Sequence, residues 1–195
     1  MRFVPLFVLF ALASVRAEAP QPQPIFTGTD LTGWNVPEGN DASGWYKAEG
    51  GILKIQSDPT QKGSILWTEK TYRDFVITFD FKFGAGTVDS GIHIRNNDQI
   101  QIGISGSLKR DMTGSPYVGK YPVEATGVAE LLKQDDWNSM KIEARGLRYL
   151  VWLNGQQVLD YTSETGIPEG PIGIQLHAGK DMAIDYREIK VAELP

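Results

Sequence analysis

One nine-residue run constrains the fold of this chain more than any other feature. In FVITFDFKF, residues 75–83, every second side chain is apolar, from Phe75 through to Phe83. Successive side chains of a strand point to opposite faces of a sheet, so a period of two residues predicts a strand with one buried face. The run therefore predicts a sheet whose Phe-rich face packs against a core.

The same alternation returns along most of the chain, between groups of turn residues. Residues 44–57 predict a hairpin that turns at Glu49-Gly50-Gly51, and residues 148–161 predict one that turns at Asn154-Gly155. Strands are also expected at residues 139–146, 170–179 and 182–194, whereas the one helix candidate is a single turn at residues 128–133. This pattern predicts an all-β fold, a two-sheet antiparallel β-sandwich.

The first residues resemble an export signal. Arg2 precedes an apolar run that is too short to span a membrane, and Val15-Arg16-Ala17 fits a cleavage site with small residues. We expect a signal peptide at residues 1–17 cleaved near Ala17, a Pro-Gln linker at 18–24 and one domain at 25–195; a retained anchor is the alternative. The absence of cysteine excludes disulfides and a lipoprotein anchor, and favours a periplasmic or secreted protein without a membrane span after cleavage.

Composition excludes several kinds of partner and cofactor. The net charge of -5 argues against nucleic acid, because binding to a phosphate backbone needs clustered Lys and Arg. The chain has no P-loop, no G-x-G-x-x-G, no H-E-x-x-H and no G-x-S-x-G motif. With two histidines and no cysteine, neither a transition-metal site nor a cofactor is expected, although oxygen ligands in loops leave a structural calcium open.

The stretch from Asp89 to Ser105 contains the candidate site. It predicts two strands joined at Asn96-Asn97-Asp98, with isoleucines on one face. The other face carries polar side chains that are unusual for plain solvent exposure: His93, Arg95, Gln99 and Gln101. Residues 172–177 repeat this pattern and add Gln175 and His177. We therefore predict one polar site built from both segments; ordinary surface residues and a glutamine hydrogen-bond ladder are the alternatives.

Each polar side chain suggests a role at this site. Histidine suits proton transfer near neutral pH, so His177 or His93 is the candidate proton-transfer group. Arg95 could clamp a carbonyl or hydroxyl oxygen, or else pair with Asp80. The glutamines Gln99, Gln101 and Gln175 could read sugar hydroxyls, since an amide both donates and accepts.

Two further groups of residues could complete a sugar site. The irregular stretch 108–130 is long enough for a functional loop, whose Asp111, Thr113, Ser115 and Tyr117 could close over a ligand. Trp67 and Trp152 could stack on a sugar ring. A solvated loop and buried core tryptophans are the alternatives.

Short motifs spread over residues 25–194 resemble one known family, the DUF1080 or 3-keto-disaccharide hydrolase domain. They are FTGTDLTGW (26–34), YRDF (72–75), DSGI (89–92) with Arg95, TGSPY (113–117), WN (137–138), NG (154–155) and QLH (175–177). The resemblance implies a concanavalin A-like jelly roll with a carbohydrate cleft on its concave sheet. It also implies hydrolysis of 3-keto-glycosides, in which the ketone acidifies the C2 proton and a base begins an elimination.

One departure from the family pattern matters for activity. The pattern E-x-Q-I-x-D reads here as QIQIGI, so Gln99 and Ile104 replace Glu and Asp. Glutamine cannot act as a base. The leading hypothesis is therefore an exported glycoside hydrolase acting on 3-keto-glycosides, and the alternative is a non-catalytic carbohydrate-binding module that has lost these carboxylates.

Overall fold

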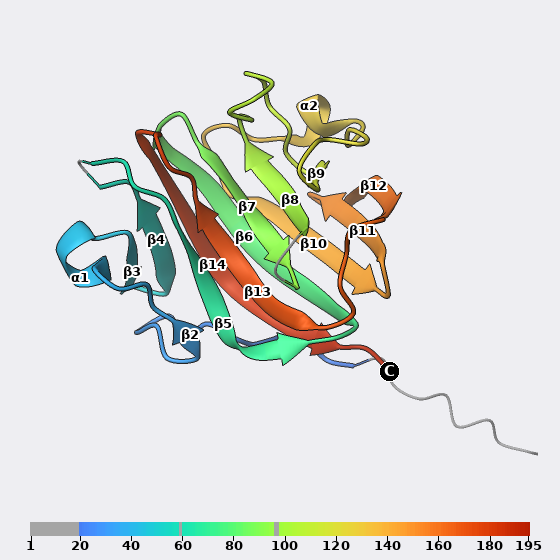
Figure 1. Ribbon diagram of the computed structural model, residues 1–195, viewed down its shortest axis with the longest axis horizontal. Coiled ribbons are helices and arrows are strands. Elements are labelled where there is room, and N and C mark those ends of the chain that lie inside the picture. Colours follow the sequence, from blue (N-terminus) through green and yellow to red (C-terminus); the bar gives the residue numbers. More distant parts are fainter. Residues whose placement is uncertain (1–19, 59, 96–97) are drawn as a thin grey trace, which may run out of the picture.

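Two antiparallel sheets packed face to face make up nearly all of the molecule (Figure 1). The computed structural model describes residues 20–58, 60–95 and 98–195. The expected signal peptide and the turn residues Asn96 and Asn97 lie outside the described residues. No helix in the described part of the chain has the length and apolar character needed to cross a membrane.

The larger sheet, sheet A, contains the Phe-rich strand and both predicted hairpins. Its strand order is β12-β11-β10-β6-β14-β4-β3, with β1 paired to one end of β14. The bounds are β12 Gln156–Thr162, β11 Arg148–Leu153, β10 Asn138–Arg145, β6 Phe75–Gly86, β14 Met182–Glu193, β4 Ile52–Gln56, β3 Tyr46–Glu49 and β1 Gln23–Pro24.

The smaller sheet, sheet B, contains the stretch singled out from the sequence. Its order is β2-β5-β13-β7-β8-β9, so β13 lies between β5 and β7, just as β14 lies between β4 and β6 in sheet A. The bounds are β2 Trp34–Asn35, β5 Ser64–Tyr72, β13 Gly170–Leu176, β7 Asp89–Ile94, β8 Asp98–Gly103 and β9 Pro116–Tyr117. Two helical turns, α1 (Asn40–Ser43) and α2 (Val128–Leu131), lie outside the sheets.

The alternation places the core correctly. Phe75, Phe79 and Phe81 of β6 are buried and face the isoleucines of sheet B, which are inaccessible to solvent at Ile92, Ile94, Ile100, Ile102, Ile172 and Ile174. The turn at Asn154-Gly155 has the left-handed backbone that this dipeptide favours, with φ of 48° at Asn154. The all-β sandwich and the single turn at α2 are thus confirmed.

Two local expectations were wrong. Gln23 and Pro24 of the expected linker form β1, because backbone pairing with Val191 and Lys190 needs no apolar side chain. Helix α1 was not predicted. It forms between two left-handed glycines, and the Asn40 amide both accepts from the Tyr46 backbone N–H and donates to the Tyr46 carbonyl, at 2.9 and 3.0 Å.

Three buried tyrosines predict a loss of stability at alkaline pH. Burial raises the pKa of Tyr46, Tyr149 and Tyr186 above the usual value near 10. The unfolded phenols ionise first, so this stability is fully present below about pH 10 and is lost as pH rises, at up to ~1.4 kcal/mol per pH unit for each tyrosine. Urea unfolding at pH 9 and 11 measures how steeply the free energy of unfolding falls with pH. The Tyr186→Phe variant should lose less stability between these two pH values. An unchanged loss would contradict the assignment of this pH dependence to the buried tyrosines.

Candidate functional site

The outer face of sheet B carries one continuous row of side chains across five strands. Trp67 of β5 is paired with Gly173 of β13, Gly173 with His93 of β7, His93 with Gln99 of β8, and Gln99 with Tyr117 of β9. The two predicted segments therefore meet through β7 and β13, as the sequence suggested. His93 and His177 lie on the same sheet, with His177 directly after the end of β13.

Two glycines allow large side chains to lie flat on this face. A Cβ at Gly173 would stand 2.5 Å from a ring carbon of Trp67, and one at Gly91 would stand 2.2 Å from the amide nitrogen of Gln99. Real side chains do not approach this closely, so any residue other than glycine would lift the indole or the amide off the sheet. The glycines in the alternating pattern are thus part of the site.

The three predicted glutamines form a directional chain of amides. Gln101 donates its Nε2 to Oδ1 of Asp89 at 2.8 Å. Gln99 donates its Nε2 to Oε1 of Gln101 at 3.1 Å and to Oε1 of Gln175 at 3.0 Å. A carboxylate only accepts, so Asp89 turns the Gln101 nitrogen toward itself and the Gln101 oxygen toward Gln99. The orientation of all three amides follows from this one buried charge.

Asp89 was not predicted as a site residue. Its side chain is 3% exposed, and its Oδ2 accepts no hydrogen bond from the described residues. Two potentially cationic groups approach that atom: Nζ of Lys180 at 3.5 Å and Nε2 of His177 at 3.9 Å. An ionised carboxylate is costly to bury unless it is paired, and the Lys180 ammonium group supplies the pairing. We call Asp89, His177 and Lys180 the charged cluster.

The charged cluster and the glutamines border one cavity of about 480 Å³. This size is typical of small-ligand sites. The predicted residues that line it are Gln99, Gln101, Tyr117, Gln175 and His177. Residues that sequence reasoning missed are Asp89, Lys109, Tyr121 and Lys180. Asp89 shares the alternation of Gly91 and His93, a signal that could have found it, whereas Lys180 lies in a loop after β13 without any periodic pattern.

His177 is the histidine whose ring reaches this cavity. Its side chain is 43% exposed, and its Nδ1 lies 2.6 Å from the carbonyl oxygen of Ala178. A carbonyl oxygen only accepts, so Nδ1 carries the proton, and Nε2 holds a lone pair whenever the ring is neutral. Nε2 is also the atom nearest Asp89. His177 can therefore accept a proton at Nε2, and the resulting imidazolium would face a carboxylate.

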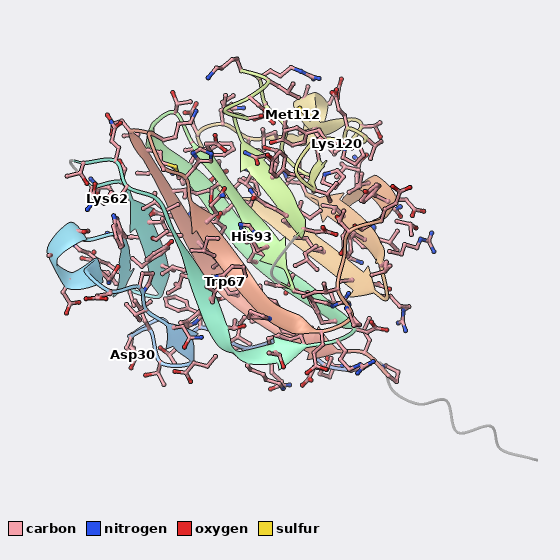
Figure 2. The ribbon with its side chains drawn as sticks, viewed as in Figure 1. Asp30, Lys62, Trp67, His93, Met112 and Lys120 are labelled. Atoms are coloured by element: carbon pink, nitrogen blue, oxygen red, sulfur yellow. The ribbon has the colours of Figure 1, made fainter. Side chains whose placement is uncertain are left out.

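Aromatic rings flank the polar floor on two sides. The rings of Tyr117 and Tyr121 lie 5.1 Å apart at the cavity wall, and burial raises the pKa of Tyr121, which keeps its phenol protonated. On the other side, the Trp67 and His93 rings lie 5.2 Å apart near the middle of sheet B (Figure 2). His93 is 9% exposed and does not border the cavity. Its placement fits packing against Trp67 better than the predicted proton transfer.

Arg95 does not share the face of His93, which corrects the prediction. It follows the last residue of β7 with a left-handed backbone, φ 55°, and this turn sends the side chain into the interior. The guanidinium is fully buried and donates to the carbonyl oxygens of Gly146, Ile167 and Ala144 and to the Asp74 carboxylate, not to Asp80. Arg95 is a structural residue that joins loops at one end of the sandwich.

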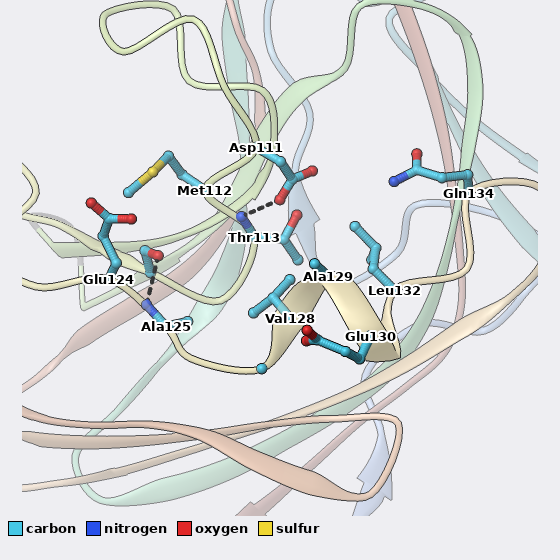
Figure 3. Close-up of a pocket in the computed structure, with 12 residues that line it drawn as sticks. Asp111, Met112, Thr113, Glu124, Ala125, Val128, Ala129, Glu130, Leu132 and Gln134 are labelled. Atoms are coloured by element: carbon cyan, nitrogen blue, oxygen red, sulfur yellow. Dashed lines mark hydrogen bonds between the residues drawn. The ribbon is translucent and has the colours of Figure 1, made fainter.

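Trp152 and Asp111 also lie away from the cavity. Trp152 is on β11 in sheet A, where Nζ of Lys141 stands 3.3 Å from its ring centroid, so it belongs to the opposite sheet. Asp111 accepts a hydrogen bond from the Thr113 backbone and borders a separate cavity beside α2 with Thr113 and Ser115, as Figure 3 shows. Of the loop residues expected to close over a ligand, Tyr117 is the one that lines the polar cavity.

Metal-binding side chains do not gather at this site. Within the described ranges, no three His, Cys, Asp or Glu residues are grouped closely enough to hold an ion. Lys180 stands beside Asp89, so a cation there would meet an ammonium group already in place.

Solved structures with a similar fold include a glycosyl hydrolase-like protein and a carbohydrate binding module. A putative glycosyl hydrolase from Parabacteroides distasonis ATCC 8503 matches with a TM-score of 0.67 at 22% identity, over 89% of this chain and 100% of that chain. The carbohydrate binding module CBM66 from Bacillus subtilis matches with a TM-score of 0.53 at 15% identity, over 83% and 96%. A Bacillus subtilis protein with a galectin-like fold matches with a TM-score of 0.53 at 15% identity, over 91% and 97%.

The protein is thus a β-sandwich that shares its fold with a glycosyl hydrolase-like protein and a carbohydrate binding module, and the outer face of its smaller sheet holds a cavity lined by glutamines and aromatic rings. The family model of the 3-keto-alpha-glucoside-1,2-lyase-like domain matches residues 21–192, and the chain belongs to this family. A search of curated proteins found no match.

Proposed function

We propose that this protein hydrolyses 3-keto-glycosides in the cavity on the outer face of sheet B. The observation that supports the proposal is the charged cluster, which places a potential base, an ammonium group and a carboxylate beside three glutamines that border the same cavity. A ketone at C3 makes the C2 proton acidic, so cleavage needs a base and a stabiliser for the enolate oxygen. The paired carboxylates of ordinary glycosidases are not required.

The proposed reaction uses the residues of the charged cluster in turn. Nε2 of neutral His177 takes the C2 proton, and the electron pair of the C2–H bond moves to the C3 oxygen as an enolate. Lys180 stabilises this oxyanion, the role first expected of Arg95. The enolate then collapses, a C1–C2 double bond forms, and the C1–O bond to the second group breaks. The leaving oxygen takes the proton from His177, and water adds across C1–C2.

Asp89 has a positioning role in this scheme. Its Oδ2 holds Lys180 and faces the imidazolium formed at His177, while its Oδ1 fixes the amides of the glutamine chain. Gln99, Gln101 and Gln175 would bind sugar hydroxyls, and Tyr117 would pack on the ring. We also propose that the chain is exported to the periplasm or secreted, because residues 1–17 resemble a signal peptide.

The direct test is release of free sugar from a 3-keto-disaccharide by the wild-type chain. Replacing His177 with alanine is expected to lower kcat by about 10²- to 10⁴-fold, the usual contribution of a general base. The Trp152→Ala variant is the matched control, because Trp152 lies on the opposite sheet and should retain full activity. Equal losses in both variants would argue against a site on sheet B.

The alternative is a non-catalytic carbohydrate-binding module, favoured by Gln99 and Ile104 in place of the carboxylates of the family pattern. The same assay separates the two functions. Turnover at background level together with saturable binding of the 3-keto-disaccharide would establish the binding module. Binding should then be weakened by Gln175→Ala and unaffected by Trp152→Ala.

A further inference from the structure

We infer that the cavity on sheet B selects glycosides that carry an acidic group, such as a carboxylate, and that Lys109 recognises this group. The inference rests on the proposed function and specifies its substrate class. The whole chain has a net charge of -5, but the cavity lining includes two lysines, Lys109 and Lys180, and a single carboxylate, Asp89. A basic cavity in an acidic protein attracts anionic ligands, because low-dielectric walls focus the field of the lining charges.

The carboxylate of the lining offsets the charge of one lysine and not of the other. Asp89 is 3% exposed, its Oδ1 accepts from Gln101, and its Oδ2 lies 3.5 Å from Nζ of Lys180. The charge of Lys180 is therefore matched within the protein. Lys109 forms no ion pair with any residue that the structure describes. A ligand with one negative charge would supply the missing partner.

The turn that contains Lys109 lies directly against the charged cluster. A Cβ at Gly106 would stand 3.0 Å from Oδ2 of Asp89 and 3.6 Å from Nζ of Lys180. The backbone N–H of Lys109 donates to the Ser105 carbonyl oxygen at 2.9 Å, which closes the turn. The turn and the charged cluster thus border the same part of the cavity.

The next residue of this turn shows the opposite arrangement. The guanidinium of Arg110 donates two hydrogen bonds to the Glu124 carboxylate, and Arg110 does not border the cavity. Lys109 does border the cavity, together with the hydroxyl group of Ser107, which can donate to the same anion. In the proposed reaction the enolate oxygen is stabilised by Lys180. The second lysine therefore indicates a second negative charge, one that the substrate itself brings.

Charge selectivity tests the inference. The first substrate pair is 4-carboxyphenyl and 4-carbamoylphenyl 3-keto-glucoside, which are nearly equal in size and differ by one negative charge on the leaving group. The second pair, methyl 3-keto-glucuronoside and its neutral amide, places the charge on the keto sugar. Lys109→Gln should lower the ratio of kcat/KM for the charged over the neutral substrate by about fivefold in at least one pair, the scale of a partly exposed ion pair. Lys109→Glu should lower it further.

The matched control is Lys141→Gln. It removes the same charge from the opposite sheet, where Lys141 is paired with Trp152 across β10 and β11, so both ratios should equal those of the wild type. Ratios that do not change in either Lys109 variant would overturn the inference. The same loss of preference in Lys141→Gln would also overturn it, because the effect would then come from net charge alone.

A binding measurement separates this inference from the proposed function. The wild type and Lys109→Gln are titrated calorimetrically with 4-carboxyphenyl and 4-carbamoylphenyl glucoside, and with methyl glucuronoside and its amide, none of which has the ketone. At about 0.01 M salt the wild type should bind the charged member of one pair about fivefold more tightly, and both Lys109→Gln and about 1 M salt should remove this preference. If the wild type shows the preference without turnover of any keto substrate, the hydrolase proposal fails while the charge selectivity stands. If it binds both members of both pairs equally at low salt, the charge selectivity fails whatever the activity.

Discussion

Replacing Arg95 with methionine is expected to lower the free energy of unfolding by about 3–5 kcal/mol. The guanidinium is fully buried and ties together three backbone carbonyls and the Asp74 carboxylate. Methionine fills similar volume but donates nothing, so these acceptors lose a charged partner. Urea unfolding of the variant and the wild type measures the difference.

The matched control for Arg95 is Arg187→Met. Arg187 pairs with Asp80 and stacks over Trp137, but its side chain is 39% exposed, so its loss should cost less than about 1 kcal/mol. The folded fraction of Arg95→Met should keep its KM for a 3-keto-disaccharide. Normal stability with a large loss of kcat would instead restore Arg95 to the catalytic role first predicted.

Replacing Asp89 with asparagine is expected to lower kcat by about 100-fold or more, the scale seen when a residue that orients a catalytic histidine is neutralised. Asparagine removes the charge that pairs Lys180 and faces His177, while a side-chain oxygen can still accept from Gln101. Stability should change little, because a neutral amide is cheaper to bury than a carboxylate. Stopped assays with the 3-keto-disaccharide and urea unfolding provide the two readouts.

Asp98→Asn is the control for this variant. Asp98 is a buried carboxylate on the adjacent strand, but it faces the core, where it accepts from Tyr149 at 2.7 Å and from Thr165 at 2.8 Å. Its replacement should reduce stability and leave kcat intact. If instead Asp98→Asn lowers kcat and Asp89→Asn lowers only stability, the functional carboxylate is Asp98.

The hydrogen bonds that begin at Asp89 give a physical reason for Gln99 in place of the Glu of the family pattern. Gln99 donates its amide nitrogen to the oxygens of Gln101 and Gln175 and to the Ser90 carbonyl. A glutamate at this position would set a carboxylate against those three acceptors. The buried carboxylate on this face of sheet B is Asp89 of β7, and glutamine is the residue on β8 that its hydrogen-bond network accommodates.

The sequence was sufficient to predict the architecture and about half of the site. Period-two alternation assigns side chains to faces, so the isoleucine core, the glutamines and His177 were all placed correctly. Alternation fails where the backbone leaves the strand, and the left-handed turn at Arg95 is such a point. Alternation also does not show which sheet a strand joins. The prediction that Trp152 stacks on a sugar at this site therefore failed, because its strand belongs to the opposite sheet. Lys180 required the tertiary structure, because its loop has no period.

The last two strands of the chain have consequences for the order of biosynthesis. β13 separates β5 from β7, and β14 separates β4 from β6, so each sheet consists of two unconnected parts until its late strand arrives. The contact between Asp80 and Arg187 alone joins two residues that are 107 positions apart in the chain. Such long-range closure slows folding. A nascent chain on the ribosome can therefore complete neither the sandwich nor the sugar cavity until its final strands have emerged, and fold and function mature in a single late step.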